Sequence, residues 1–177
     1  MRLKYKLYIG LLILLFTSCA KQRQDDQLLT ILPSNKTGIK FSNSLTPSLD
    51  INVFNYMYFY NGGGAGTGDL NNDGLVDIVL TANQVENRIY LNKGNMEFVD
   101  ITEIAGFFSD EGWSNGVAIN DVNQDGYLDI YISQVGKLHN IEAHNLLFIC
   151  DGIGEDGIPT YSERSKDFGL DLQGFGT

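Results

Sequence analysis

An acidic twelve-residue segment occurs twice in the chain, and this repetition constrains the fold more than any other feature. DLNNDGLVDIVL at residues 69–80 returns as DVNQDGYLDIYI at residues 121–132, a spacing of 121 minus 69, or 52 residues. Each copy is followed by further short apolar segments and by turns that contain glycine. Self-similarity at a fixed spacing indicates a fold that is built from repeated structural units.

Each repeat unit predicts about four short β-strands. Those of the first unit are expected at residues 64–68, 76–82, 88–92 and 97–102, since these segments are short and rich in β-branched and aromatic residues. TEIAG at 102–106 is expected to form a helical turn. A four-stranded unit of this length is typical of a β-propeller blade, so the predicted class is all-β.

Two blades cannot close a propeller. A third unit begins at GFGT, residues 174–177, where the chain stops. We therefore expect about two blades of an incomplete propeller, with the remainder beyond Thr177, and we expect that this chain is not a stable monomer by itself.

The repeated loop has the chemistry of a calcium site. Its pattern, Asp-x-Asn-x-Asp-Gly-x-x-Asp, offers hard oxygen ligands, which suit Ca²⁺ better than Mg²⁺ or a transition metal. An EF-hand is excluded because its twelfth position requires Glu, and that position holds Leu80 and Ile132. The alternative is a pair of Asx-type turns without metal. The predicted ligands are Asp69, Asn71, Asp73, Asp77 and the Leu75 carbonyl in loop one, and Asp121, Asn123, Asp125, Asp129 and the Tyr127 carbonyl in loop two.

Charge and cysteine content exclude other classes. The chain has 177 residues and a formal net charge of −10, which argues against nucleic-acid binding because that function needs a basic face. The same charge is compatible with binding cations. Two cysteines do not make a disulfide framework.

The N-terminus predicts secretion. Three basic residues within MRLKYK precede the apolar run LYIGLLILLF, which is the layout of a signal peptide and too short to span a membrane. The following residues, FTSC, resemble the bacterial lipobox, so Cys19 is predicted to carry the lipid, palmitate included. The alternative is an ordinary signal peptide with an incidental cysteine. The predicted location is the bacterial cell envelope, anchored in the outer membrane and open to exposure at the cell surface.

These features predict that the chain has three parts. The expected parts are a signal peptide at 1–18, a lipidated tether at 19–36 and a repeat region at 37–177, the last comprising N-terminal strands at 37–61, blade one at 62–108, blade two at 112–170 and the start of blade three at 171–177.

Two segments outside the acidic loops are rich in unusual residues. NVFNYMYFY at 52–60 alternates aromatic residues, and we interpret it as a strand that is buried on both faces, the alternative being an exposed aromatic platform for a ligand such as a sugar. NGGGAGTG at 61–68 is expected to permit close packing of strands near the propeller axis, and Cys150 is expected to be a buried free thiol in a strand.

The sequence contains only weak matches to catalytic motifs. GWSNG at 112–116 matches a nucleophile elbow, but it leads into a predicted strand rather than a helix, so Ser114 is interpreted as a residue of the repeat's turn. His139 and His144 are predicted to lie in a surface insertion between strands. No catalytic residue is predicted, and we expect that the chain is not an enzyme.

GAGTGDLNNDGLVDIVL and GVAINDVNQDGYLDIYI together resemble FG-GAP/VCBS repeats, the blade type of integrin α-subunit propellers. With NVFNYMYFYNGGG and the lipidated N-terminus, residues 37–177 resemble bacterial lipoproteins of the cartilage-acidic-protein-like group. The resemblance implies a seven-bladed propeller with calcium at its loops and a binding or adhesion role towards a protein or glycan ligand. The alternative function is an accessory part of a larger envelope enzyme whose catalytic residues lie beyond residue 177.

Overall fold

The computed structural model describes residues 28–108, 112–138 and 141–174. The chain divides into two compact units, Met1–Leu32 and Pro33–Thr177. In the first unit, the described residues 28–32 form neither helix nor strand. The predicted signal peptide, Cys19 and the first half of the tether lie outside the described residues. None of the helices within these ranges has the length and hydropathy that crossing a bilayer requires.

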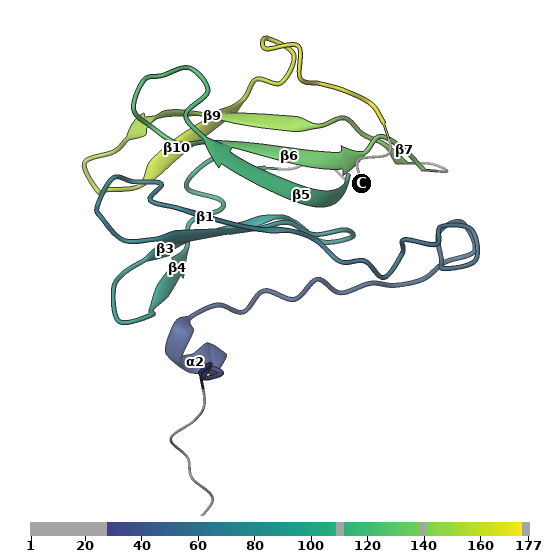
Figure 1. Cartoon of the computed structure of the whole chain (residues 1–177), viewed down its shortest axis with the longest axis horizontal. Helices are drawn as coiled ribbons and strands as arrows, with labels where there is room; N and C mark the ends of the chain where they lie inside the picture. Colours follow the sequence, from purple (N-terminus) through teal and green to yellow (C-terminus); the bar gives the residue numbers. More distant parts are fainter. Residues whose placement is uncertain (1–27, 109–111, 139–140, 175–177) are drawn as a thin grey trace, which may run out of the picture. The chain divides into compact units, whose positions relative to one another are not determined.

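The first repeat of the second unit forms a four-stranded antiparallel sheet, here called blade one, in which neighbouring strands follow chain order (Figure 1). Its strands are β1 (Ala65–Gly68), β2 (Asp77–Leu80), β3 (Arg88–Asn92) and β4 (Phe98–Asp100). Each strand lies within the range that the sequence predicts for it. Chain-order pairing through short turns is the arrangement expected of a propeller blade.

The second repeat forms a second four-stranded antiparallel sheet, blade two, in the order β10-β9-β6-β5. Its strands are β5 (Trp113–Asn120), β6 (Asp129–Val135), β9 (Leu146–Ile153) and β10 (Pro159–Glu163). Between β6 and β9 a small hairpin, β7 (Lys137–Leu138) with β8 (Ile141–Glu142), confirms the predicted insertion. His139 lies outside the described residues, and His144 Nδ1 lies 2.9 Å from the Asn145 carbonyl oxygen. The all-β class is thus confirmed.

One apolar core joins the two blades. It combines side chains of both sheets, such as Val79 and Ile89 of blade one with Ile130 and Phe148 of blade two. Figure 1 shows the two sheets as stacked layers. Cys150 belongs to this core in β9 as a buried free thiol, as predicted, and burial raises its pKa.

The predicted helical turn after β4 lies between the blades. The Ala105 amide donates to the Ile101 carbonyl at 2.8 Å, which closes one helical turn. The Tyr161 amide of β10 donates to the Ala105 carbonyl, also at 2.8 Å. Immediately afterwards, the Phe107 ring packs against the Phe148 ring with 4.4 Å between centroids, and only 1% of Phe107 is exposed. This turn therefore contributes both a backbone bond and a large ring to the joint.

Glycine in β1 permits the close approach of the two sheets, as the sequence predicts. A Cβ atom placed on Gly66 would lie 3.0 Å from Cδ1 of Ile119 and 3.1 Å from Cγ1 of Val117, both on β5. Such spacing leaves no room for a side chain without displacing its neighbours.

The prediction of strands at 37–61 is wrong. Residues 38–61 contain neither helix nor strand, since the one-turn helix α2 (Ser34–Thr37) ends at the start of the segment, and residues 49–61 form a series of turns and bends. The aromatic segment is not buried on both faces either, because only Tyr56 and Phe59 are buried. Backbone amides here donate to oxygens of nearby asparagine and serine side chains, and these bonds stabilise turns and compete with strand pairing.

Side-chain amides attach the N-terminal part of this segment to blade one. Asn43 and Asn83 exchange two hydrogen bonds, at 2.7 and 3.0 Å. Thr46 and Gln84 likewise exchange two, at 2.6 and 3.2 Å. These amide pairs replace the backbone pairing that a strand would have provided.

The joint between the blades generates a prediction about stability. Phe107→Ala should lower the free energy of unfolding by about 3–5 kcal/mol, because it opens a cavity among Phe148 and Tyr161 in the core. Phe108→Ala should change it by no more than about 0.5 kcal/mol, because 65% of Phe108 is exposed. Urea denaturation of both variants measures the difference, and equal effects would contradict the assignment of Phe107 to a shared core.

Candidate functional site

The first acidic loop closes on its own backbone amides. Asp69 accepts hydrogen bonds from the amides of Asp73 at 3.0 Å and Gly74 at 2.8 Å. Asp73 Oδ1 accepts from the Leu75 amide at 2.8 Å. The turn needs the left-handed conformation at Asn72, with φ of 57°, and at Gly74, with φ of 85°, and asparagine and glycine tolerate it best.

The second loop has the same geometry. Asp121 accepts from the amides of Asp125 at 3.1 Å and Gly126 at 2.9 Å, and Asp125 accepts from the Tyr127 amide at 2.9 Å. Gln124 and Gly126 take the positions with positive φ. Two loops that differ at the intervening residues thus share one conformation, which shows that the repeated residues determine it.

The aspartate at the ninth position of each loop is buried and connects the loop to a neighbouring strand. Asp77 accepts from the Leu70 amide and from the Asn92 amide at the end of β3, both at 2.8 Å. Asp129 accepts from the Val122 amide and from the Cys150 amide in β9, both at 2.9 Å. Sequence reasoning assigned these aspartates to a metal and missed this structural role, because the strand partners are distant in sequence.

Burial raises the pKa of Asp77, because desolvation disfavours the charged carboxylate. The two backbone amides partly oppose this rise, and the negative charges of Asp73 and Asp69 add to it. A cation nearby would act in the opposite direction by favouring the ionised form.

The third position of each loop holds an asparagine whose amide bonds within the loop. Asn71 Nδ2 donates to Asp73 Oδ2 at 3.0 Å, and Asn123 Nδ2 donates to Asp125 Oδ2 at 2.7 Å. Asn71 Nδ2 also reaches the Gly157 carbonyl of blade two at 3.1 Å, and Asn72 Nδ2 reaches the Gly126 carbonyl of loop two at 3.2 Å. These contacts between the blades have no signal in the sequence, since they join residues far apart along the chain.

The structure therefore gathers the predicted ligands into two loops but directs their carboxylates at backbone amides of the loops and of the neighbouring strands. Within the described ranges, no group of three or more histidine, cysteine or carboxylate side chains is arranged to hold a metal ion. The donor set nonetheless fits Ca²⁺, because it consists of carboxylate, amide and carbonyl oxygens. Three ion pairs occur among the described residues, and none of them includes an aspartate of either loop. The negative charges of the loops are thus not balanced by ion pairing within that part of the chain.

Ser114 is a structural residue of the joint between the blades. It lies inside β5 rather than in a turn, which corrects the position inferred from the repeat. Its hydroxyl oxygen accepts hydrogen bonds from Asn87 Nδ2 at 3.2 Å and from Gln134 Nε2 at 2.9 Å, and only 1% of the residue is exposed. This buried hydroxyl thereby joins Gln134 of β6 to Asn87, which lies between β2 and β3.

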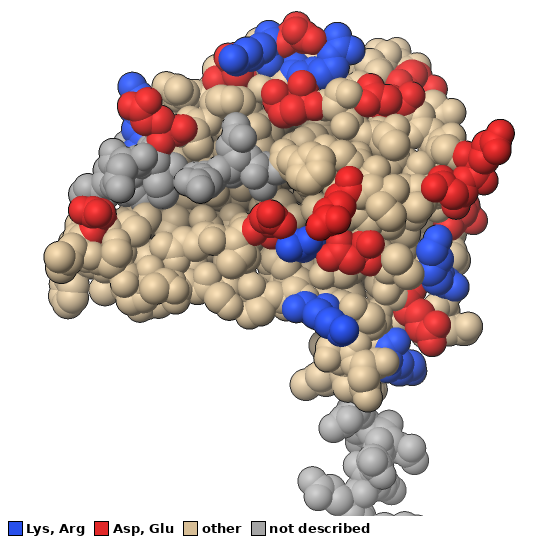
Figure 2. Space-filling view, turned by 180° about the vertical axis from the view of Figure 1, so that it is seen from behind, with Lys and Arg blue, Asp and Glu red and all other residues tan. Residues whose placement is uncertain are grey.

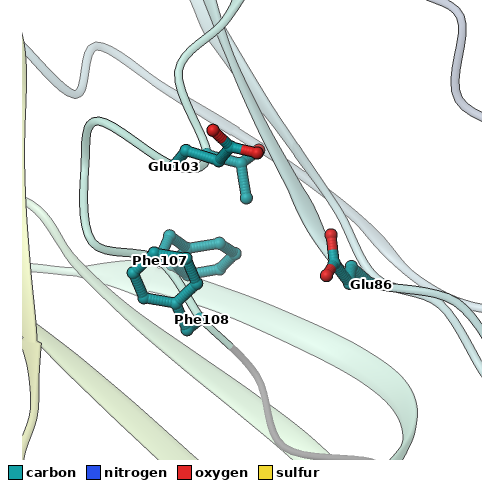
Figure 3. A pocket seen from close by; sticks show the side chains of 5 residues that line it. Glu86, Glu103, Phe107 and Phe108 are labelled. Atoms are coloured by element: carbon teal, nitrogen blue, oxygen red, sulfur yellow. The ribbon is translucent and has the colours of Figure 1, made fainter.

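A hollow of about 430 Å³ lies beside the turn that follows β4 and is lined by Glu86, Thr102, Glu103, Phe107 and Phe108. Figure 3 shows its two glutamates and two phenylalanine rings. None of the sequence-predicted site residues lines it. The acidic loops therefore remain the candidate site.

Comparison with known proteins supports the repeat assignment. Residues 69–132 match the sequence model of the FG-GAP-like repeat. The match begins at loop one, includes loop two and ends within β6. A comparison with curated proteins found no match. FG-GAP-like repeats, together with the two four-stranded sheets, indicate a propeller-type binding module.

The geometry of Asp77 generates a prediction that does not depend on any metal. Asp77→Asn should lower the free energy of unfolding in excess chelator by about 1–3 kcal/mol, because Leu70 and Asn92 donate to different oxygens of the carboxylate and asparagine would place an NH2 donor against one of them. Asp73→Asn should have a smaller effect, since Asp73 is exposed and its replacement keeps an oxygen for the Leu75 amide. Equal urea midpoints for the two variants would contradict the structural role of Asp77.

Proposed function

We propose that this FG-GAP repeat protein is a calcium-binding lipoprotein of the bacterial cell envelope and acts there as a binding or adhesion module. The observation that carries the proposal is the pair of acidic loops, which share both sequence pattern and hydrogen-bond geometry. The repeats supply the architecture for binding, and the loops supply the cation sites.

The donor chemistry supports calcium over other metals. Each loop offers three carboxylates, one amide oxygen and the carbonyl at its seventh position, Leu75 or Tyr127. These are hard oxygen ligands, and Ca²⁺ binds six to eight of them in flexible geometry, whereas Mg²⁺ retains more water. Calcium would supply positive charge at the loops, and the backbone amides of Asp73 and Gly74 would hold the Asp69 carboxylate in place within its loop.

Electrostatics supports a cation for a second reason. Three carboxylates close together in one loop repel one another, and this repulsion grows where water is excluded. Asp77 and Asp129 are both buried, with exposed fractions of 0% and 1%. Hydrogen bonds from neutral amides lower the cost of burying such a charge but do not neutralise it. A divalent cation would offset the repulsion in both loops.

The envelope location rests on the N-terminal sequence. A basic segment, an apolar run and a cysteine at its end match the signal and lipobox of bacterial lipoproteins. A lipid on Cys19 would tether the repeat region to the outer membrane. Propeller ligands usually bind at loops, so a protein or glycan ligand would meet the loop ends of the blades.

Calorimetry tests the calcium proposal. The folded chain should bind two Ca²⁺ ions, and Asp69→Asn with Asp73→Asn should reduce this to one, because loop two remains intact. At a free Ca²⁺ concentration one hundred times Kd, each site should add about 2.7 kcal/mol to the free energy of unfolding.

The control for this measurement is Glu97→Gln with Glu103→Gln, which removes the same number of exposed carboxylates from blade one outside the loops. This control should still bind two ions. Absence of binding heat in the unmodified chain, with the same melting temperature in calcium and in chelator, would refute calcium binding.

Mass spectrometry tests the lipid anchor. In a bacterial host with lipoprotein processing, the mature chain should begin at a lipidated Cys19 and partition into detergent. Cys19→Ser should yield an unlipidated product that remains in the aqueous phase or an unprocessed precursor. A mature, unlipidated chain that begins after Cys19 would show that the cysteine is incidental.

A further inference from the structure

The turns at residues 49–60 expose an unusual number of large apolar side chains. These are Leu49 at 97%, Val53 at 42%, Phe54 at 99%, Met57 at 74%, Tyr58 at 45% and Tyr60 at 65% of their surface. We call these six side chains the aromatic patch. In Figure 1 the segment that carries it is a loop at the right of the view, past the ends of the blade-one strands. Concentration of apolar surface on one short segment marks an interaction site.

Buried aromatic rings support two of the patch side chains, Tyr58 and Tyr60. Tyr56 and Phe59 are buried and pack on Trp113 of β5, each with 5.4 Å between ring centroids. The exposed rings stand against these buried ones, with Tyr58 at 5.9 Å from Tyr56 and Tyr60 at 4.9 Å from Phe59. A surface whose side chains are ordered before binding loses less entropy when it binds.

The two asparagine side chains of the segment form hydrogen bonds within it. Asn52 accepts from the Phe54 amide at 2.9 Å and donates to the Ser48 carbonyl at 2.8 Å. Asn55 accepts from the Asn52 amide at 2.8 Å and donates to the Asp50 carbonyl at 2.9 Å. Both asparagine side chains therefore already use their oxygen and their nitrogen. A sugar needs such groups as partners for its hydroxyls, so this arrangement favours an apolar occupant over a glycan.

The segment that carries the patch differs from the repeats in net charge. Residues 37–68 contain one basic residue, Lys40, and one acidic residue, Asp50, and are neutral in sum. Residues 69–177 contain 19 acidic and 5 basic residues, so their net charge is 5 minus 19, or −14. Figure 2 shows acidic side chains spread over one face of the molecule. A bilayer with anionic lipids repels such a body, and the neutral segment can approach it with the least repulsion.

The length of the tether limits the distance between the repeat region and a membrane that holds Cys19. From Cys19 to Pro33 the chain advances 33 minus 19, or 14 residues, which span at most about 48 Å when fully extended. A lipid on Cys19, which belongs to the function proposed above, would hold the repeat region within that distance of the membrane.

We propose that the aromatic patch docks into the interfacial layer of a lipid bilayer. Tyrosine and phenylalanine suit this layer, because their rings enter the boundary of the acyl chains while the tyrosine hydroxyls stay among the headgroups. Docking would fix the side of the repeat region that faces the membrane.

The test places a fluorophore on the patch. Phe54→Cys, labelled with a polarity-sensitive dye, is compared with Ile104→Cys, which is 63% exposed in the turn after β4. Cys150 is 2% exposed and should not react in the folded chain. Both proteins carry Cys19→Ser and are titrated with phosphatidylcholine vesicles. The dye at position 54 should shift to the blue and be quenched by brominated lipid, whereas the dye at position 104 should not respond.

A second pair of variants measures the contribution of the patch. Phe54→Ser, Met57→Ser and Tyr60→Ser together should weaken partition of the Cys19→Ser chain into vesicles by roughly tenfold or more. Val99→Ser, Ile104→Ser and Phe108→Ser remove the same number of exposed apolar side chains from β4 and the residues that follow it, and they should leave partition unchanged. Because these arms lack the lipid, they test the patch even if Cys19 proves not to be lipidated.

Three results would overturn the proposal. The first is a dye at position 54 that stays in water at saturating lipid, and the second is equal partition of the two triple variants. The third is self-association that depends on concentration and is lost in the patch variant, which would assign the patch to a second copy of this chain instead of a membrane.

Discussion

The hydrogen bonds of one buried aspartate per blade hold each acidic loop in place. Asp77 joins the start of loop one to the end of β3, and Asp129 joins the start of loop two to β9. A buried carboxylate without partners would be costly, so these amides must remain where the carboxylate can reach them. The loop, its following strand and the neighbouring strand therefore form one unit, and the remaining loop aspartates are presented in the same way in both blades.

The joint between the blades depends on this arrangement. With the loops fixed, Asn72 of loop one reaches the Gly126 carbonyl of loop two, and Asn71 reaches the Gly157 carbonyl beyond β9. Phe107 fills the space between the sheets, and Gly66 lets β1 approach β5. Acidic loops of successive blades are consequently neighbours, which concentrates negative charge and increases the benefit that the proposed calcium ions would bring.

The segment that precedes blade one differs from the repeats in charge and in the way it is held. Asparagine and glutamine side chains attach it to blade one, and Tyr56 and Phe59 anchor it on Trp113. It exposes several large apolar side chains and has no net charge over residues 37–68, whereas the repeats are strongly acidic. We infer a division of roles in which the repeats bind cations and ligand while the preceding segment orients the molecule on a membrane.

The sequence by itself determined the blades and the loops. The alternation of short β-branched segments with Asx- and Gly-containing turns is local information, so the strands of blade one were predicted within two residues of where they lie. The identity of the loop residues was equally local, because a nine-residue pattern encodes the turn. Tertiary structure alone decided which face of the aromatic segment is buried, because Trp113 lies more than fifty residues away from Tyr56. It also decided that Asp77 accepts a hydrogen bond from the end of β3 and that Asn71 contacts blade two, since the partners of a polar group depend on which strands fold beside it.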